Sequence, residues 1–230
     1  MHSPPDVGVL IAAAGKGIRV GGAEPKQFRL IAGVPMLLRA MRPFIEHPRV
    51  AQLVIALPAS AAADPPNWLL DDIDERIQLV VGGESRAESV QAALEALDPS
   101  CGIVLVHDAA RPFVSNETID AVITVAARLG ALPAVPVADT IKRGDETTKL
   151  VLETIDRHGL WRAQTPQGCP REMLERAFEA VGPSRVQYYT DESSLLEAAG
   201  FQVRLVPDTA GNFKVTTEDD FAFAEAMLRR

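Results

Sequence analysis

The sequence predicts an α/β fold with a doubly wound, mostly parallel sheet. Short apolar runs rich in Val, Ile, Leu and Ala alternate along the chain with longer stretches whose apolar residues recur at helical spacing. The short runs are almost continuously apolar, which is typical of strands that helices cover on both faces. The length of 230 residues fits one large domain, so we expect a single domain over 1–230 with a β-hairpin arm at 138–159.

Each expected element has a local signal. Strands are expected at the apolar runs 7–13, 52–57, 77–81, 103–107, 131–137 and 202–206. Helices are expected after Pro35, after Ser85, and over 119–126, 171–181, 191–199 and 218–228. Proline suits the first turn of a helix. Ser85 with Glu88 has the spacing of a capping box, and so does Thr216 with Asp219.

The stretch 138–159 interrupts this alternation. Its β-prone segments 140–143 and 148–155 flank a polar turn with Gly144 and Asp145, which predicts a hairpin outside the main sheet. An isolated hairpin is only marginally stable in water, so we expect it to pack either on its own domain or on a second subunit. The Pro- and Ala-rich stretch 58–66 predicts a surface loop.

The composition argues against several classes of protein. The net charge of −8 argues against a general nucleic-acid binder, because phosphate contacts need a basic face. The longest apolar run, 7–14, is far too short to span a bilayer, and no basic stretch precedes it, so we expect neither a membrane span nor a signal peptide. Cys101 and Cys169 lie far apart without ligand spacing, which predicts buried thiols in a reducing cytoplasm.

The segment after the first apolar run predicts a ligand site. Small residues there let a ligand approach the backbone closely: Ala13, Ala14, Gly15 and Gly17. Ligands of open α/β sheets bind beyond the carboxyl ends of the strands, and a long loop before Pro35 is typical of function. The loop carries cations that suit a polyphosphate: Lys16, Arg19 and Lys26. The spacing fits neither a Walker A loop nor a dinucleotide fingerprint.

Asp108 follows the expected strand 103–107 and therefore falls on the same edge as the glycine loop. Because Mg²⁺ takes one or two protein carboxylates together with phosphate oxygens, Asp108 is a candidate magnesium ligand. The alternative is that Asp108 caps a turn or pairs with Arg111. We expect His107 to be a packing or hydrogen-bonding histidine.

Two further segments are ambiguous. Gly82, Gly83 and Ser89 precede and begin a helix, where backbone N–H groups suit a base or ribose; a glycine turn with a capping serine would have the same sequence. Lys214 lies in a strand-like stretch and is either a phosphate ligand or a solvated edge lysine, and spacing alone favours the solvated edge.

The motifs for an activated nucleophile are missing. The sequence has no nucleophile elbow, no Cys/His pairing and no histidine cluster for zinc. This suits a reaction in which one substrate phosphate attacks another, because such a nucleophile is already ionised. Catalysis then consists of aligning two polyanions and neutralising charge with Lys, Arg and Mg²⁺.

Taken together, these motifs resemble the 2-C-methyl-D-erythritol 4-phosphate cytidylyltransferase family, within the Rossmann-like sugar-nucleotide nucleotidyltransferases. The resemblance runs from about Val7 to Leu228 and rests on Ala13-Ala14-Gly15-x-Gly17-x-Arg19, Pro25-Lys26-Gln27, Gly82-Gly83 with Arg86 and Ser89, the run 106–112, Asp139-Thr140-x-Lys142, Thr165-Pro166-Gln167, Thr190-Asp191-Glu192 and Asn212-x-Lys214-Val215-Thr216.

The resemblance implies that CTP and methylerythritol phosphate give CDP-methylerythritol and pyrophosphate with Mg²⁺, for isoprenoid biosynthesis. It implies that Arg19 and Lys26 stabilise the transition state. It implies that the Ala13 to Gly17 backbone, Gly83 and Ser89 contact CTP, and that Asp108 lies near metal and substrate. The acceptor phosphate would be held by Arg111, Thr140, Arg157 and Lys214.

The resemblance also implies a homodimer in which each arm, 138–159, reaches the partner's site, so that Thr140 and Arg157 act across the interface. The sequence departs from the family's usual Pro, Arg and Met at Ala12, Ile18 and Val20, which bears on loop rigidity and CTP affinity. The alternatives are a ribitol 5-phosphate cytidylyltransferase and a non-catalytic nucleotide-binding dimer module.

Overall fold

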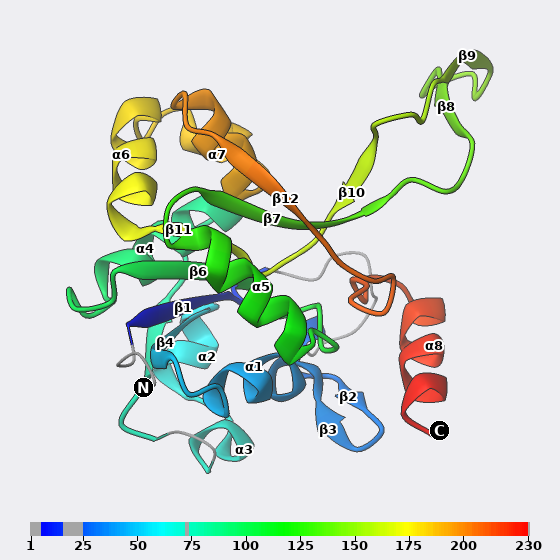
Figure 1. Ribbon diagram of the computed structural model, residues 1–230. Helices are drawn as coiled ribbons and strands as arrows, with labels where there is room; N and C mark the ends of the chain where they lie inside the picture. Colours follow the sequence, from blue (N-terminus) through cyan, green and yellow to red (C-terminus); the bar gives the residue numbers. More distant parts are fainter. Residues whose placement is uncertain (1–5, 16–24, 72–73, 230) are drawn as a thin grey trace.

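The computed structural model describes residues 6–15, 25–71 and 74–229, and its centre is one mixed sheet (Figure 1). In the described residues the strand order is β10-β7-β11-β6-β1-β4-β5, with β12 paired to β7. The strands are Val7–Ala12 (β1), Val50–Leu57 (β4), Ile77–Val81 (β5), Ile103–Asp108 (β6), Gly130–Pro136 (β7), Trp161–Ala163 (β10), Gln167–Pro170 (β11) and Val203–Pro207 (β12). The pairs β1–β4, β1–β6, β4–β5 and β12–β7 are parallel, which confirms the mostly parallel sheet.

Helices cover both faces of this sheet, which confirms the doubly wound α/β class. One core cluster joins the sheet to Met36–Ile45 (α1), Ala59–Ala63 (α2), Asn67–Leu70 (α3) and Asn116–Ala126 (α5). The opposite cluster joins it to Arg86–Glu95 (α4), Arg171–Val181 (α6) and Glu192–Ala198 (α7). Alternate residues of β1 serve the two clusters, since Val9 and Ile11 face the first and Leu10 the second.

A smaller third cluster lies at the carboxyl edge of the sheet. It packs Glu218–Leu228 (α8) against a short hairpin, Leu30–Ile31 (β2) and Val34–Pro35 (β3). A 3₁₀ turn, Lys26–Phe28 (η1), precedes that hairpin. The sequence predicted a long loop between β1 and α1. The described part of that segment, residues 25–35, instead contains a 3₁₀ turn and a short hairpin.

The parallel register brings the predicted site segments to one edge. Ala12 at the end of β1 pairs with Asp108 at the end of β6 and with Ala56 on β4. The loop after β1, the end of β6 and the start of α4 therefore begin at the same place. This is the edge at which ligands of open α/β sheets bind.

The sequence missed β11, which lies between β6 and β7 and runs antiparallel to both. Its four residues read QGCP, too short and too rich in breakers for a strand signal. Gly168 is required there, since a Cβ atom would lie 2.6 Å from Leu105 and 2.9 Å from Ala126. The glycine lets α5 pack closely on the sheet.

Two other local expectations are wrong. The stretch 58–66 contains the helix α2, Ala59–Ala63, because Pro58 starts a run of alanines with high helix propensity. The capping box of α8 is Thr217 with Asp220, one residue later than the expected pair, although Thr216 also donates to the Asp220 carboxylate. The capping box of α4, Ser85 with Glu88, is confirmed.

The arm forms a separate two-stranded sheet of Ile141–Gly144 (β8) and Val151–Ile155 (β9), as predicted. It stands away from the main sheet at the end of the long excursion between β7 and β10 (Figure 1). Leu150, Val151 and Leu152 on it are 63–66% exposed. The hairpin therefore does not pack on its own domain. In the described residues, no helix combines the length and hydrophobicity that a bilayer crossing requires.

Candidate active site

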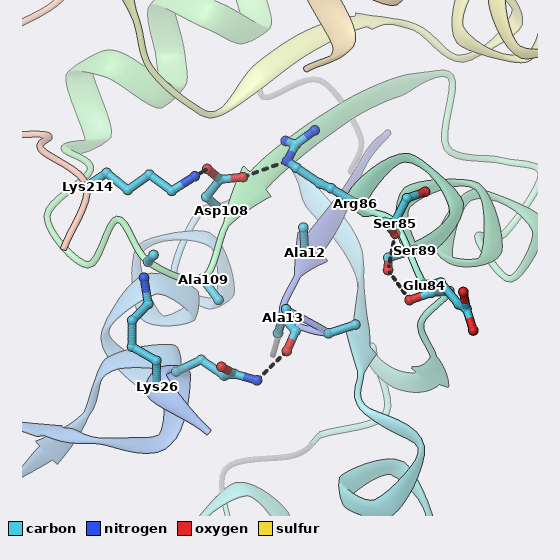
Figure 2. Close-up of a pocket in the computed structure, with 15 residues that line it drawn as sticks. Ala12, Ala13, Lys26, Glu84, Ser85, Arg86, Ser89, Asp108, Ala109 and Lys214 are labelled. Atoms are coloured by element: carbon cyan, nitrogen blue, oxygen red, sulfur yellow. Dashed lines mark hydrogen bonds and ion pairs between the residues drawn. The ribbon is translucent and has the colours of Figure 1, made fainter. Parts of the chain in front are cut away.

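A pocket of about 390 Å³ opens at the carboxyl edge of β1 and β6 (Figure 2). Its lining combines small residues from the end of β1, the turn before α4, and charged groups from three distant segments. The lining residues are Ala12, Ala13, Ala14, Gly15, Lys26, Gln27, Gly83, Glu84, Ser85, Arg86, Ser89, Asp108, Ala109, Ala110 and Lys214. The structure thus brings these candidate site residues together in one pocket: Ala13, Ala14, Gly15, Lys26, Gly83, Ser89, Asp108 and Lys214.

The close contact of β1 with α4 depends on a glycine. A Cβ atom at Gly82 would lie 2.3 Å from the Ala14 Cβ and 2.8 Å from the Ser89 Oγ. Because Gly82 has no side chain, the end of β1 and the first turn of α4 can form adjacent walls of one pocket.

Ser89 is buried in the first turns of α4, and its hydroxyl donates to the Ser85 carbonyl at 2.9 Å. The Ser85 side chain in turn caps the helix. The helix N-terminus at this wall is a favourable place for partial negative charge. The serine that caps the helix is therefore Ser85. Ser89 does not cap the helix, and it lines the pocket.

A chain of charged side chains runs from the exposed Lys214 through the buried Asp108 to Arg86, and all three line the pocket. The Arg86 Nε lies 2.9 Å from one Asp108 carboxylate oxygen, and the Lys214 Nζ lies 2.7 Å from the other. Figure 2 shows the two cations approaching Asp108 from opposite sides. The Arg86 guanidinium also binds Glu192, the first residue of α7, through two hydrogen bonds of 2.6 and 2.9 Å. Asp108 therefore pairs with Arg86 and Lys214, and the alternative in which it pairs with Arg111 is wrong.

The ion pairs among these charged side chains fix their protonation states. Burial alone would raise the pKa of Asp108, but Arg86 and Lys214 outweigh burial and hold that pKa well below its usual range. Burial likewise would lower the pKa of Arg86, and the two carboxylates Glu192 and Asp108 raise it further than burial lowers it. Asp108 thus offers an ionised carboxylate inside the pocket at neutral pH.

Lys26 reaches the pocket from η1. Its Nζ donates to the Val215 carbonyl at 2.8 Å. The next residue, Gln27, is 4% exposed, and its side-chain amide donates to the Ala13 carbonyl at 2.6 Å. Gln27 therefore fastens the turn that carries Lys26 to the end of β1.

Lys214 is exposed, but it does not lie in an edge strand. It lies in an irregular segment before α8, and its pairing with the buried Asp108 brings its ammonium group into the pocket. Spacing suggested a strand because residues 212–216 alternate polar and apolar side chains. Val215 instead turns inward, and its N–H donates to the Ala110 carbonyl at 2.8 Å.

Arg111, Thr140 and Arg157 do not line this pocket. Arg111 is buried, and its guanidinium donates to the carbonyls of Asn212 and Ala163 at 2.7 and 3.1 Å. Thr140 and Arg157 lie exposed at the base of the arm, where Arg157 donates to the Ala138 carbonyl. The predicted site residues Gly17 and Arg19, with Lys16, lie outside the described residues.

His107 is a hydrogen-bonding histidine, as expected. Its ring nitrogens contact the Arg111 carbonyl at 2.9 Å and the Thr165 hydroxyl at 3.0 Å. Burial lowers the pKa of His107 to about 4, so the ring is neutral at physiological pH. Both ring nitrogens are occupied, so His107 orders the end of β6 beside Asp108.

Sequence reasoning gave Arg86 no role of its own, although it is the centre of the charge chain. The position of Arg86 at the start of a predicted helix pointed to an ion pair. A cation there is unfavourable next to the positive end of the helix dipole and needs a carboxylate nearby. No pattern in the sequence could have identified Glu192 as that carboxylate, since the two residues are 106 positions apart.

Known proteins match this chain over nearly its full length. The family model described as "2-C-methyl-D-erythritol 4-phosphate cytidylyltransferase" matches residues 7–230. The chain is 42% identical over 221 residues to the Salinibacter ruber protein of that name, covering 95% of this chain and 91% of that one. It is 40% identical over 222 residues to the "Bifunctional enzyme IspD/IspF" of Desulfotalea psychrophila, covering 96% of this chain but only 56% of the bifunctional protein.

A solved structure agrees. The Francisella tularensis 2-C-methyl-D-erythritol 4-phosphate cytidylyltransferase aligns with a TM-score of 0.82 and 32% identity, over 96% of this chain and 99% of that one. The names favour methylerythritol phosphate over ribitol 5-phosphate and an enzyme over a non-catalytic module. The fold, the pocket and these matches together show that the chain is a nucleotidyltransferase and belongs to the 2-C-methyl-D-erythritol 4-phosphate cytidylyltransferase family.

Proposed function

We propose that this chain joins CTP and 2-C-methyl-D-erythritol 4-phosphate into CDP-methylerythritol, with release of pyrophosphate, as a step of isoprenoid biosynthesis. The observation that carries the proposal is the convergence of Lys26, Lys214 and Asp108 on one pocket with a backbone-lined wall. Two polyanions that react with each other require cations such as these two lysines around a single site.

CTP would occupy the wall made by the end of β1 and the start of α4. The backbone at Ala13, Ala14 and Gly15 lines this wall, and so do Gly83 and Ser89. We assign base and ribose contacts to these groups, together with Gly17 by resemblance. The triphosphate would then extend toward Lys26, with Arg19 as its second cation by resemblance.

In the reaction, an ionised oxygen of the acceptor phosphomonoester attacks the α-phosphorus of CTP. A bond forms between that oxygen and the α-phosphorus, and the bond from the α-phosphorus to the oxygen that bridges to the β-phosphorus breaks. Pyrophosphate leaves with the electron pair of the broken bond. The nucleophile carries no proton to remove, so the protein aligns the two phosphates and Lys26 neutralises the charge that builds up in the transition state.

The acceptor would lie beside Lys214. We assign Lys214, Thr140 and Arg157 to the acceptor phosphate; Arg111, which the resemblance places there, is buried outside the pocket and has a supporting role. Lys214 is in the pocket, and Arg111 supports it by holding the Asn212 carbonyl two residues earlier. Thr140 and Arg157 are on the arm, so we assign them to the site of a partner subunit.

We also propose a homodimer that exchanges its arms. The arm exposes the contiguous apolar residues Leu150, Val151 and Leu152, and exposed apolar surface of this kind is typical of a protein interface. A cytoplasmic location accords with the free, buried thiols of Cys101 and Cys169.

We propose Mg²⁺ as a cofactor of this pocket, held by Asp108 when substrate phosphates displace part of its pairing with Arg86 and Lys214. The buried, ionised Asp108 is the type of oxygen ligand that Mg²⁺ takes, and one or two carboxylates suffice where phosphates complete the coordination. When bound, the ion would neutralise triphosphate charge. In the described part of the chain no three His, Cys, Asp or Glu side chains form a metal cluster, so Asp108 would hold it with substrate oxygens.

The magnesium proposal has a test independent of turnover. Mn²⁺, which can replace Mg²⁺ in such sites, is titrated into the protein with CTP present while its electron paramagnetic resonance signal is followed. We expect Asp108→Asn to weaken Mn²⁺ binding, whereas Asp120→Asn, at an exposed carboxylate of α5 that does not line the pocket, leaves it unchanged. Equal Mn²⁺ affinity in wild type and Asp108→Asn would contradict the assignment.

The proposed reaction is tested by incubating the protein with CTP, Mg²⁺ and either methylerythritol phosphate or ribitol 5-phosphate. We expect pyrophosphate release with methylerythritol phosphate at a kcat/KM far above that with ribitol 5-phosphate. A preference for ribitol 5-phosphate would overturn the acceptor, and no release with either would favour the non-catalytic module.

A further inference from the structure

We propose that Arg29 and Glu218 form a latch that positions Lys26 for the transition state. The latch joins η1 to the N-terminus of α8, which are far apart in sequence. Arg29 is thus a positioning residue that acts through Lys26. The inference rests on the proposed function, because it assigns Lys26 its role in the reaction.

The latch has two parts. The Arg29 guanidinium donates to both carboxylate oxygens of Glu218 at 2.6 and 2.9 Å, a bidentate geometry that fixes orientation as well as distance. The same guanidinium lies 4.0 Å from the ring centroid of Phe221, one turn further along α8, in a cation–π contact. Phe221 is 6% exposed and belongs to the third core cluster. Arg29 is therefore tied to a rigid part of α8.

The connection from the latch to Lys26 is short. The backbone N–H of Arg29 donates to the Lys26 carbonyl at 3.2 Å and closes the 3₁₀ turn. The Lys26 Nζ contacts the Val215 carbonyl, three residues before Glu218. The two segments are thus joined at two points, by the bond from Lys26 to Val215 and by the ion pair of Arg29 with Glu218. The two points lie three residues apart on each segment.

The consequence concerns the two lysines of the pocket. Lys214 immediately precedes Val215, so the latch sets the position of Lys26 relative to Lys214 and Asp108. Gln27 fixes the other side of the turn to β1. Without the latch, η1 would keep the Gln27 bond to β1 and the Lys26 bond to Val215, but it would lose the ion pair that fixes its orientation against α8. The Lys26 ammonium group would then be displaced from the phosphate that it must stabilise.

The test replaces Arg29 by Gln, which removes the charge and the bidentate geometry. We expect Arg29→Gln to lower kcat about tenfold, since small displacements of catalytic groups have effects of this order or more. The KM for CTP should change by less than about twofold, because Lys26 is needed in the transition state rather than for ground-state binding.

Arg49→Gln is a matched control. Arg49 has the same side-chain exposure as Arg29, 29%, and also binds a carboxylate bidentately, that of Asp6 at the opposite end of β1. Arg49→Gln should leave kcat unchanged. Exposed pairs contribute little to stability, so both variants should melt close to wild type.

Two combined variants make the proposal specific. The charge swap Arg29→Glu with Glu218→Arg should recover most of the lost kcat. The double variant Lys26→Ala with Arg29→Gln should be no slower than Lys26→Ala alone, because a latch that acts through Lys26 has nothing left to position. An unchanged kcat in Arg29→Gln, or losses that multiply in the double variant, would overturn the latch. Failure of the proposed function would instead appear as an inactive wild type.

Discussion

Lys26 and Lys214 enter one pocket from opposite ends of the chain and are held by different partners. Lys26 donates to a backbone carbonyl, whereas Lys214 donates to the carboxylate of Asp108. The carboxylate in turn shares Arg86 with Glu192. The positions of the two lysines thus depend on these partners, and the position of Asp108 depends in turn on Arg86 and Glu192.

Lys26→Ala tests the role of this lysine. We expect kcat to fall by about 10²–10³, a typical loss for one preorganised stabilising group, while the affinity for CTP changes much less. Steady-state kinetics and calorimetric titration of CTP measure the two quantities separately. Arg76→Ala, which removes an exposed partner of Asp74, serves as the control. A wild-type kcat in Lys26→Ala would contradict the role given to Lys26.

Helix α7 shows how one element contributes both to stability and to the site. Its N-cap, Asp191, accepts hydrogen bonds from the Gln167 amide, the Ser193 hydroxyl and the Ser194 N–H. The bond from Gln167 attaches the start of α7 to β11, the other two cap the helix, and the next residue, Glu192, reaches Arg86. The position of Arg86 beside Asp108 therefore depends on the start of α7.

Asp191→Asn should destabilise the protein by about 1–2 kcal/mol at pH 7, because it removes an acceptor from a partly buried network. Burial raises the pKa of Asp191, but the hydrogen bonds from Gln167, Ser194 and Ser193 outweigh it and lower that pKa. A carboxylate with a depressed pKa stabilises the fold above its unfolded pKa of about 3.9, and this stabilisation is lost as the pH falls further.

The stability difference between wild type and Asp191→Asn should therefore narrow below about pH 4. Urea unfolding at pH 7 and pH 3 measures this difference, and Asp219→Asn in the exposed first turn of α8 is the control. A variant as stable as wild type at pH 7, or a difference that does not narrow in acid, would count against the network.

The sequence predicts the strands that helices bury on both faces. It misses the short strand whose position depends on contacts with distant parts of the chain. Strands such as β1 and β6 are covered on both faces, so their apolar runs are unambiguous. β11 is not predictable in this way, because its place between β6 and β7 depends on a glycine that accommodates α5. The charge chain from Lys214 to Glu192 is likewise a product of tertiary packing, which no local pattern records.

At the scale of the whole molecule, the sheet and the arm have different functions. The sheet brings β1, β6 and α4 to one edge and so creates the pocket. The arm stands away from the main sheet (Figure 1), and Thr140 and Arg157 at its base do not line the pocket of their own chain. This placement is the basis for the proposal that the two residues act in the pocket of another chain.

The shared site is tested by complementation. Arg157→Ala and Lys26→Ala should each be nearly inactive alone, and mixing them should restore part of the activity. A mixed dimer then has one pocket with an intact Lys26 and an intact partner arm. Native mass spectrometry confirms that mixed dimers form. Mixed dimers without recovered activity would remove the exchange of arms from the account.

The most direct measurement of the central claim is a crystal structure of the protein with CTP and Mg²⁺ in the absence of the acceptor. The account predicts the cytosine and ribose against Ala13–Gly15, Gly83 and Ser89, with the triphosphate between Lys26 and the Asp108–Lys214 pair. CTP bound elsewhere, or a triphosphate that contacts neither lysine, would contradict it.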